Sequence, residues 1–163
     1  MHYQVRKAVS EDLGRIEEIY AYARKFMAEH GNPNQWGKTE PPHDQLVQDI
    51  HDGTLHVVMQ NNTIHGVFFF WIGEDPTYGY MENGNWSSNT PYGTIHRIAG
   101  DGSGGILKTA IAFAQNQIGH LRIDTHEDNF IMQNALDKLE FQSRGIIYLP
   151  DGSPRIAYER IRE

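Results

Sequence analysis

A glycine-rich segment between two predicted elements has the residue types and spacing best suited to bind an anion. Residues 100–105 read Gly-Asp-Gly-Ser-Gly-Gly, after a strand-like stretch at 92–99 and before a helix-like stretch at 106–118. Glycine lets consecutive backbone N–H groups turn toward one point, because no Cβ blocks that conformation or the approach of a ligand. The N-terminus of the following helix adds a partial positive charge. The segment therefore predicts a site for a phosphate or pyrophosphate, and a surface loop without a ligand is the alternative.

Two nucleotide-binding patterns overlap this segment. Residues 100–105 match the dinucleotide fingerprint Gly-x-Gly-x-x-Gly, and the next predicted strand contains Asp124, where an acid that binds ribose would be expected. Residues 102–109 approach the Walker pattern, but Leu107 stands where the second glycine belongs, and its Cβ would disturb a phosphate cradle. Too few strand–helix repeats follow for a doubly wound sheet. This context argues against a dinucleotide-binding fold, and a small NAD(P)-binding protein or a nucleotide-binding domain remains only as an alternative function.

The elements that must position this turn follow from hydrophobic periodicity and turn residues. The expected elements are a strand at 3–9, a helix that Ser10 caps and Gly31 ends, a short helix around 46–50, strands at 54–60 and 63–72 joined by Asn61-Asn62, a strand at 92–99, a helix at 106–118, a strand at 120–125, a helix at 129–139, and strands at 141–149 and 155–160. The order is β-α-α-β-β-β-α-β-α-β-β. An antiparallel meander comes first, and a right-handed parallel crossover follows. This predicts an α/β fold with a mixed sheet of six to seven strands and helices on both faces.

Composition limits the possible functions. The 163 residues predict a single domain, 1–163. The absence of cysteine excludes disulfides, thiolate metal sites and a cysteine nucleophile, and the nine histidines show no helical metal spacing, so we expect no metal. A net charge of −7 disfavours nucleic acid and anionic membranes as partners. No apolar run approaches the length of a membrane helix, and a strand-like segment follows Met1 almost directly, so we expect a cytoplasmic protein without a signal peptide.

A second segment, residues 129–141, reads Asn-Phe-Ile-Met-Gln-Asn-Ala-Leu-Asp-Lys-Leu-Glu-Phe. It resembles the block Asn-x-x-[Ala/Met]-x-x-x-[Tyr/Leu]-x-x-x-Gly-Phe of the GNAT superfamily of acyl-CoA N-acyltransferases, with Glu140 in place of glycine. Residues 32–36, 124–129 and 145–148 are similar to a bacterial branch of these acetyltransferases, so the resemblance covers nearly the whole chain. Residues 102–107 lie on the family's [Gln/Arg]-x-x-Gly-x-[Gly/Ala] pattern with Gly105 as its central glycine, although Gly102 and Leu107 depart from it. By itself, the helix at 129–139 is also consistent with an ordinary amphipathic helix.

The resemblance implies a GNAT-type fold that binds acetyl-CoA as acyl donor. In that family the strand at 92–99 would splay from the strand at 120–125, and the pantetheine arm would enter the gap and pair with the open strand edge. A backbone N–H near Ile98 would polarise the thioester carbonyl. The donor-binding residues implied are Arg97, Ile98, Gly102, Ser103, Gly104, Gly105, Ile106, Asn129 and Met132.

Acyl transfer also needs a general base, because only the free amine attacks. His96 is one candidate, since imidazole titrates near neutral pH, and a hydrogen-bonded structural histidine is the alternative. Asp124 and His126 share a strand face and would form a relay, a weak metal pair or the polar end of a strand with Asp128 as a helix N-cap. Glu82, in the long loop at 73–91, is a further candidate, with solvation at the surface as its alternative.

The acceptor and the general acid are less defined. Four aromatic residues could wall a small-molecule or peptide amine, or else close the edge of the core: Trp36, Tyr78, Tyr80 and Trp86. Many family members protonate the leaving thiolate with a tyrosine whose place Leu136 takes here, so Tyr148 acts instead or the thiolate leaves unassisted. A non-catalytic acyl-CoA-binding domain therefore also stays open. We expect a monomer or a homodimer.

Overall fold

The computed structural model describes residues 2–162, and its elements follow one another in the predicted order. The strands are β1 (Gln4–Lys7), β2 (Leu55–Gln60), β3 (Thr63–Ile72), β4 (Gly93–Gly100), β5 (His120–Thr125), β6 (Gln142–Tyr148) and β7 (Pro154–Ile161). The α-helices are α1 (Leu13–Glu29), α2 (His43–His51), α3 (Ile106–Gln115) and α4 (Phe130–Lys138). Short 3-10 helices span Ser10–Asp12 and Pro76–Tyr78.

Within residues 2–162, the seven strands form one mixed sheet in the order β1-β2-β3-β4-β5-β7-β6. In this part of the chain only β4 and β5 are parallel neighbours, and the other neighbouring strands are antiparallel. The β2–β3 hairpin turns at Asn61 and Asn62, which adopt φ angles of 52° and 63°, as predicted for this asparagine pair. A doubly wound dinucleotide-binding sheet needs several parallel pairs, so the fold does not support that interpretation of residues 100–105.

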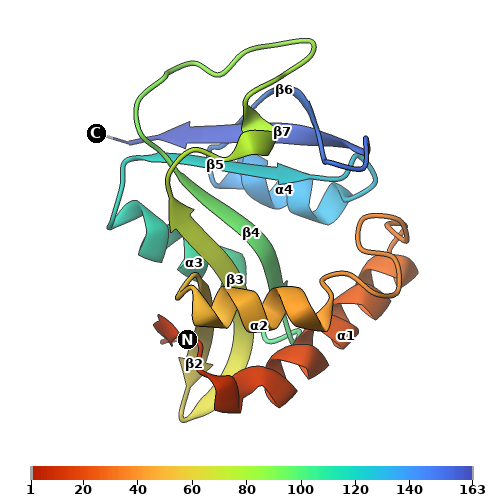
Figure 1. The fold of residues 1–163 in the computed structure, drawn as a ribbon, viewed down its shortest axis with the longest axis vertical. Coiled ribbons are helices and arrows are strands. Elements are labelled where there is room, and N and C mark those ends of the chain that lie inside the picture. The colour runs from red at the N-terminus through yellow and green to blue at the C-terminus, as the bar shows by residue number, and fades with distance from the viewer. Residues whose placement is uncertain (1, 163) are drawn as a thin grey trace.

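The parallel pair β4–β5 is short, and it opens into a gap. The two strands pair only where Gly93 faces Leu121 and Thr94 faces Arg122. Beyond these positions β5 continues along β7, whereas β4 continues along β3, and Figure 1 shows β4 running away from β5. From Ile95 onward, the edge of β4 that faces β5 has no strand partner in the described chain. The splay that the resemblance implied is therefore present.

Helices cover both faces of the sheet, as predicted. On one face α1 and α2 bury side chains such as Ile16, Ile19 and Leu46 against Leu55 and Val57. On the other face α3 and α4 build a second apolar core, which includes Phe68, Ile95, Ala110, Leu121 and Leu136. Burial of these side chains, at roughly 25 cal/mol per Å² of apolar surface, is the main force that holds the helices to the sheet. The two sides of the sheet thus carry separate cores, and the β4–β5 gap lies between them.

The structure corrects two predicted helix starts. Ser10 does not cap α1, because a 3-10 turn precedes the helix, and Asp12 instead accepts a hydrogen bond from the Val9 backbone at 2.8 Å. Asn129, not Asp128, caps α4 by accepting a 3.0 Å hydrogen bond from Met132 N. In the described residues, no helix combines the length and the apolar character that crossing a membrane requires.

Candidate active site

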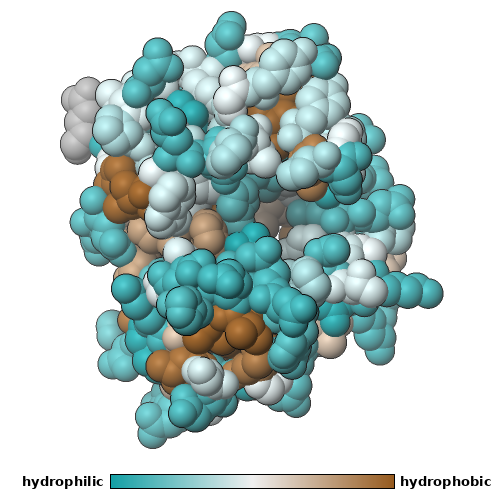
Figure 2. Space-filling view, viewed as in Figure 1, coloured by the Kyte–Doolittle hydropathy of each residue, from teal (hydrophilic) through white to brown (hydrophobic). Residues whose placement is uncertain are grey.

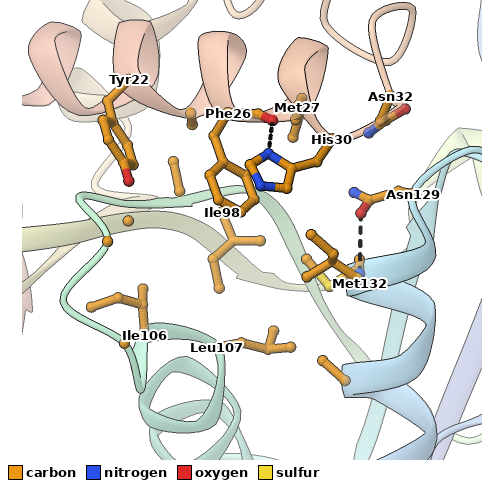
Figure 3. A pocket seen from close by; sticks show the side chains of 17 residues that line it. Tyr22, Phe26, Met27, His30, Asn32, Ile98, Ile106, Leu107, Asn129 and Met132 are labelled. Carbon is orange, nitrogen blue, oxygen red and sulfur yellow. Dashed lines mark hydrogen bonds between the residues drawn. The ribbon is translucent and has the colours of Figure 1, made fainter.

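A cleft of about 420 Å³ occupies the gap between β4 and the start of α4. Its walls come from the C-terminal half of α1, the end of β4, the turn at 100–105, the first residues of α3 and the N-terminal half of α4 (Figure 3). The described residues that line it include Tyr22, Phe26, Met27, His30, Ile98, Gly102, Gly104, Ile106, Leu107, Asn129 and Met132. Most of these side chains are apolar, so the cleft suits a long, flexible and largely uncharged ligand segment.

One end of the cleft is the N-terminus of α3. Gly102, Gly104 and Gly105 adopt φ angles of 94°, 84° and 77°, which side chains other than glycine rarely adopt. Gly105 is the N-cap residue, and within the described chain no side chain caps the helix. The first helical hydrogen bond runs from Thr109 N to Gly105 O, so the preceding amides of the first turn are donors for a ligand. This end of the cleft therefore fits a phosphate group.

The turn also uses part of its own donor set. Asp101 Oδ1 accepts hydrogen bonds from Ser103 N at 3.0 Å and from Ser103 Oγ at 2.6 Å, and Arg15 donates to Asp101 Oδ2 at 2.9 Å. Burial raises the pKa of Asp101, but the hydrogen bonds from Ser103 and His65 outweigh it and hold that pKa below its ordinary value. The Ser103 amide is thus engaged within the turn, so the amides at 104–107 are the ones available to donate hydrogen bonds to an anion.

Arg97 does not lie where the sequence placed it. It adopts a φ of 51°, and its Nε donates a 2.9 Å hydrogen bond to buried Asp49 of α2. Its guanidinium lies 4.6 Å from the centre of the Phe69 ring. The Arg97 side chain is therefore packed against α2 and does not line the cleft, which corrects its prediction as a donor-binding residue. Asn129 does line the cleft, but its amide caps α4 and donates to Gln35 Oε1 at 3.0 Å.

His96 lies where β4 leaves β5, within a cluster of acidic groups. Its Nε2 is 2.7 Å from Asp75 Oδ2, and its Nδ1 is 3.7 Å from Asp124 Oδ2. Because a carboxylate only accepts, the short contact places the ring proton on Nε2 and leaves the Nδ1 lone pair facing Asp124. Tyr78 also donates to Asp124 Oδ2 at 2.7 Å. His96 Nδ1 and the Asp124 carboxylate are thus two neighbouring hydrogen-bond acceptors.

Asp75 is the charged partner that fixes the His96 ring. Burial raises the pKa of Asp75, but hydrogen bonds from His96 and from Thr77 outweigh it and lower that pKa to about 2. The carboxylate is therefore ionised at neutral pH, and it holds the histidine in one tautomer, as in other carboxylate–histidine pairs. Burial of Tyr78 together with the nearby Asp124 charge raises the pKa of that phenol well above its ordinary value. Tyr78 thus remains a neutral hydrogen-bond donor to Asp124.

The other proposed bases lie apart from this cluster. His126 Nδ1 accepts a 3.0 Å hydrogen bond from Asp128 N, so this ring stabilises the turn before α4. No hydrogen bond or ion pair joins it to Asp124 within the described residues, so the Asp124–His126 relay is not formed. The Glu82 backbone pairs with Ile146 of β6, and β6 and β7 lie between it and β5. A hydrogen bond with Glu82 raises the pKa of Tyr148, which places both side chains at that distant edge.

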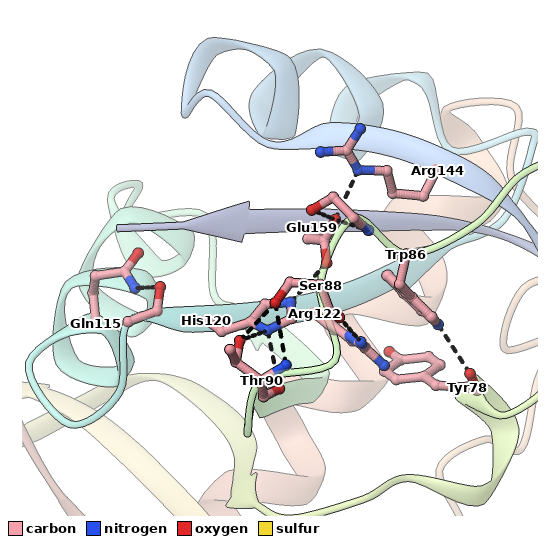
Figure 4. Close-up of polar contacts among 11 residues, drawn as sticks. Tyr78, Trp86, Ser88, Thr90, Gln115, His120, Arg122, Arg144 and Glu159 are labelled. Carbon is pink, nitrogen blue, oxygen red and sulfur yellow. Dashed lines mark hydrogen bonds and ion pairs between the residues drawn. The ribbon is translucent and has the colours of Figure 1, made fainter. Parts of the chain in front are cut away.

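The four aromatic residues do not form one wall. Tyr78 is only 2% exposed, and Trp86 donates to its carbonyl at 2.9 Å. The guanidinium of Arg122 lies 4.0 Å from the centre of the Trp86 ring, so the cation on this tryptophan belongs to the chain itself (Figure 4). Trp36 packs edge-on against Tyr20 in the α1–α2 core, whereas Tyr80 is 63% exposed. Of the four, only Tyr78 contacts the His96–Asp124 cluster.

A buried polar network fixes the long loop at 73–91. Glu159 of β7 is 1% exposed, and both its oxygens are 2.6 to 2.7 Å from donors: His120 Nε2, Arg144 Nε and Ser87 Oγ (Figure 4). The loop is therefore anchored twice, by Ser87 at one end and by the Asp75–His96 contact at the other. This double attachment holds Asp75 and Tyr78 against β4 and β5. Figure 2, which is viewed as in Figure 1, shows this face of the molecule hollowed between the α2 region below and the β5 region above.

Sequence reasoning missed two contributions to the site. Asp75 stands in a loop before Pro76, where no periodicity marks its partner. The cleft-facing residues of α1 did leave a signal, because Tyr22, Phe26 and His30 are spaced four apart and share one helical face. Within residues 2–162, no group of three or more His, Asp or Glu side chains is arranged to hold a metal ion.

The whole fold is similar to solved acetyltransferases. A GNAT-family acetyltransferase from Streptococcus agalactiae 2603 is 29% identical and superposes with a TM-score of 0.86 over 99% of this chain and 96% of that one. A GNAT-family acetyltransferase from Listeria monocytogenes 4b F2365 is 18% identical, with a TM-score of 0.72 over 98% and 95% of the two chains. A phosphinothricin acetyltransferase from Sinorhizobium meliloti, solved in complex with AcCoA, is 14% identical, with a TM-score of 0.64 over 99% and 89%.

No protein-family model matches the chain, and no curated protein sequence does. The similarity to the streptococcal enzyme nevertheless extends over nearly all of both chains, and it includes the strand pair that opens and the helix that follows it. On that similarity, the chain has the fold of the GNAT superfamily of acyl-CoA N-acyltransferases.

Proposed function

We propose that this chain transfers an acetyl group from acetyl-CoA to a primary amine of a small molecule or peptide, by direct attack in a ternary complex. The observation that carries the proposal is the cleft that runs from the uncapped N-terminus of α3 along the free edge of β4. Acetyl-CoA is present in the solved structures of the Sinorhizobium meliloti enzyme and of YncA from Salmonella typhimurium, and this supports the choice of donor.

The backbone around the α3 N-terminus would hold the donor. The amides at 104–107 and the helix dipole would bind its diphosphate, and Gly102 keeps the turn free of a Cβ that would lie 2.7 Å from the Tyr22 hydroxyl. The free edge of β4 would hydrogen-bond the pantetheine arm, with Met132 and Leu107 packing against it. The Ile98 amide would stabilise negative charge on the thioester oxygen, a contribution of about 3 kcal/mol in comparable sites.

His96 would act as the general base. Asp75 holds the Nε2 proton in place, so His96 Nδ1 is free to accept a proton from the acceptor ammonium. Asp124 lies 3.7 Å from that nitrogen and would attract the cationic acceptor before it loses its proton. The amine nitrogen would then attack the carbonyl carbon, and the carbon–sulfur bond would break. The acidic cluster thus favours a catalytic role over a domain that only binds acyl-CoA.

Two measurements test this function. Thermal unfolding with acetyl-CoA, CoA, NAD⁺, NADPH and ATP should show stabilisation by the two CoA compounds alone. Release of free thiol from acetyl-CoA should then depend on an added amine, measured across a panel of small amines and short peptides. Stabilisation by NAD⁺ or ATP in place of CoA would overturn the choice of donor. Thiol release that no amine accelerates would overturn the transfer reaction.

A further inference from the structure

The proposed reaction leaves a thiolate that needs a proton, and the expected donors of that proton are absent from the cleft. Leu136 is fully buried in the core under α4, so the helix position that the resemblance associates with a tyrosine acid is apolar. Tyr148 is held beside Glu82 at the far edge of the sheet. This inference rests on the proposed function and asks which group of the chain supplies the proton.

Among the described residues that line the cleft, Tyr22 and His30 alone carry ionisable side chains. The Tyr22 hydroxyl lies against the glycine-rich turn at 100–105 (the phosphate turn of the proposed function), only 2.7 Å from the position that a Cβ on Gly102 would take. His30 follows the end of α1, and its ring lies beside Phe26 over the part of the cleft that Ile98 of β4 also lines (Figure 3). His30 is therefore the ionisable group on the side of the cleft away from the phosphate turn.

The His30 ring is oriented by its own helix. Its Nδ1 lies 2.7 Å from the Phe26 carbonyl oxygen, and because a carbonyl only accepts, Nδ1 carries a proton in both the neutral and the charged ring. The ring also stacks on Phe26, with 3.9 Å between ring centres and an interplanar angle of 19°. The nitrogen that gains and loses a proton is therefore Nε2. His30 is otherwise exposed, so water can protonate it again after each turnover.

We propose that His30 is the general acid of this enzyme. When the carbon–sulfur bond breaks, the electron pair passes to sulfur, and the Nε2 proton of the His30 imidazolium moves to that sulfur. The products are the free thiol and a neutral His30, which takes its next proton from water. His96 takes a proton from the acceptor ammonium and His30 gives one to the leaving sulfur, so the two histidines have opposite roles.

Kinetics with two donors test this role. His30→Gln keeps a polar side chain of similar length but cannot deliver a proton, and His51→Gln, at an exposed histidine of α2, is the matched control. His30→Gln should lower kcat with acetyl-CoA about hundredfold. With S-phenyl thioacetate, whose more acidic thiol leaves without protonation, kcat should fall less than about threefold. Equal losses with both donors, or a His30→Gln enzyme as active as the control, would overturn the proposal.

A binding measurement on the wild-type chain tests the placement without turnover. The ring C–H signals of His30 are identified in NMR spectra by their absence from His30→Gln. CoA should shift these signals, whereas adenosine 3′,5′-bisphosphate, which lacks the pantetheine arm and the sulfur, should leave them in place. His30 signals that stay unmoved at saturating CoA would overturn the proposal. Failure of the proposed function is a distinct result, because the wild type would then release no thiol with any amine.

Discussion

Asp75 offers a direct test of how the long loop positions His96. Asp75→Asn keeps the shape of the side chain and removes its charge. In the wild type this carboxylate lies 2.7 Å from His96 Nε2, and it accepts from Thr77 N at 2.9 Å and from Thr77 Oγ at 2.6 Å. The side chain is 16% exposed, so solvent screens these contacts only weakly.

The expected loss follows from the pKa of Asp75. That pKa is about 2 in the folded chain, against an ordinary value of 3.8. At about 1.4 kcal/mol for each pH unit, the difference corresponds to about 2 kcal/mol of stability at neutral pH. Because the folded-state pKa lies below the unfolded-state value, this stabilisation is complete well above pH 3.8 and is lost as the pH falls toward 2. At pH 3 roughly half of it should remain.

Equilibrium urea denaturation measures both values. At pH 7, Asp75→Asn should lower the free energy of unfolding by about 2 kcal/mol, and at pH 3 by about 1 kcal/mol. Asp44→Asn, an exposed carboxylate of α2, is the control and should change little at either pH. If Asp75→Asn lost the same free energy at pH 3 as at pH 7, the stabilisation would not come from the ionised carboxylate, and the argument for a fixed His96 tautomer would fail.

Three further substitutions separate the base, the phosphate turn and the α2 contact. His96→Gln should lower kcat by about 10² or more with CoA affinity unchanged, and an active variant would exclude His96 as the base. Gly105→Glu should weaken CoA binding, measured by calorimetry, more than about tenfold, because it adds a negative charge at the phosphate turn. Gly152→Glu, at a φ of 86° with open space around it, controls for strain at positive φ and should leave affinity unchanged. Asp49→Ala should lower the free energy of unfolding by about 3 kcal/mol, because it leaves the Arg97 guanidinium without its buried partner. CoA affinity should stay within about twofold, since the Arg97 side chain packs on α2 and not in the cleft. A large loss of CoA affinity would show that Arg97 contributes to donor binding.

The element order and the mixed sheet could be predicted because they depend on local patterns. Apolar periodicity marked the helices, and the Asn61-Asn62 pair marked the hairpin. The position of the cleft followed from the glycine turn together with the family resemblance. Each of these patterns spans only a short stretch of the chain, so it can be recognised in a single sequence without an alignment.

The partners of the His96–Asp124 cluster could not be predicted in the same way. Asp75 reaches His96 across 21 positions of sequence, through a loop whose path depends on the buried Glu159 network. Trp86 and Tyr78 carry the residue types of a ligand wall, but the cation that meets the tryptophan is Arg122 from β5. Residue type alone does not tell whether an aromatic ring packs on a ligand or on the chain itself.

A bulge at Arg97 explains why the side chain of Arg97 lies away from the cleft and why its neighbours on β4 point to different faces of the sheet. In a regular strand, residues two apart share a face, so His96 and Ile98 would point the same way. Here the β3–β4 register shifts between Phe69–His96 and Val67–Ala99, so Arg97 and Ile98 together oppose one residue of β3. The positive φ of Arg97 accommodates the extra residue, and the Tyr20 hydroxyl donates to the Arg97 carbonyl.

This bulge reverses the alternation of side chains along β4. Ile95 and Ile98 both pack in the α3–α4 core, whereas His96 stacks near Phe69 on the α1–α2 side and Ala99 joins that core. The side chains of His96 and Ile98 therefore point to opposite faces of one strand, although only one residue separates them. Direct attack needs the amine nitrogen within reach of both groups, so under the proposed function the acceptor would bind at the β5-facing edge of β4, which has no strand partner beyond Thr94 in the described chain.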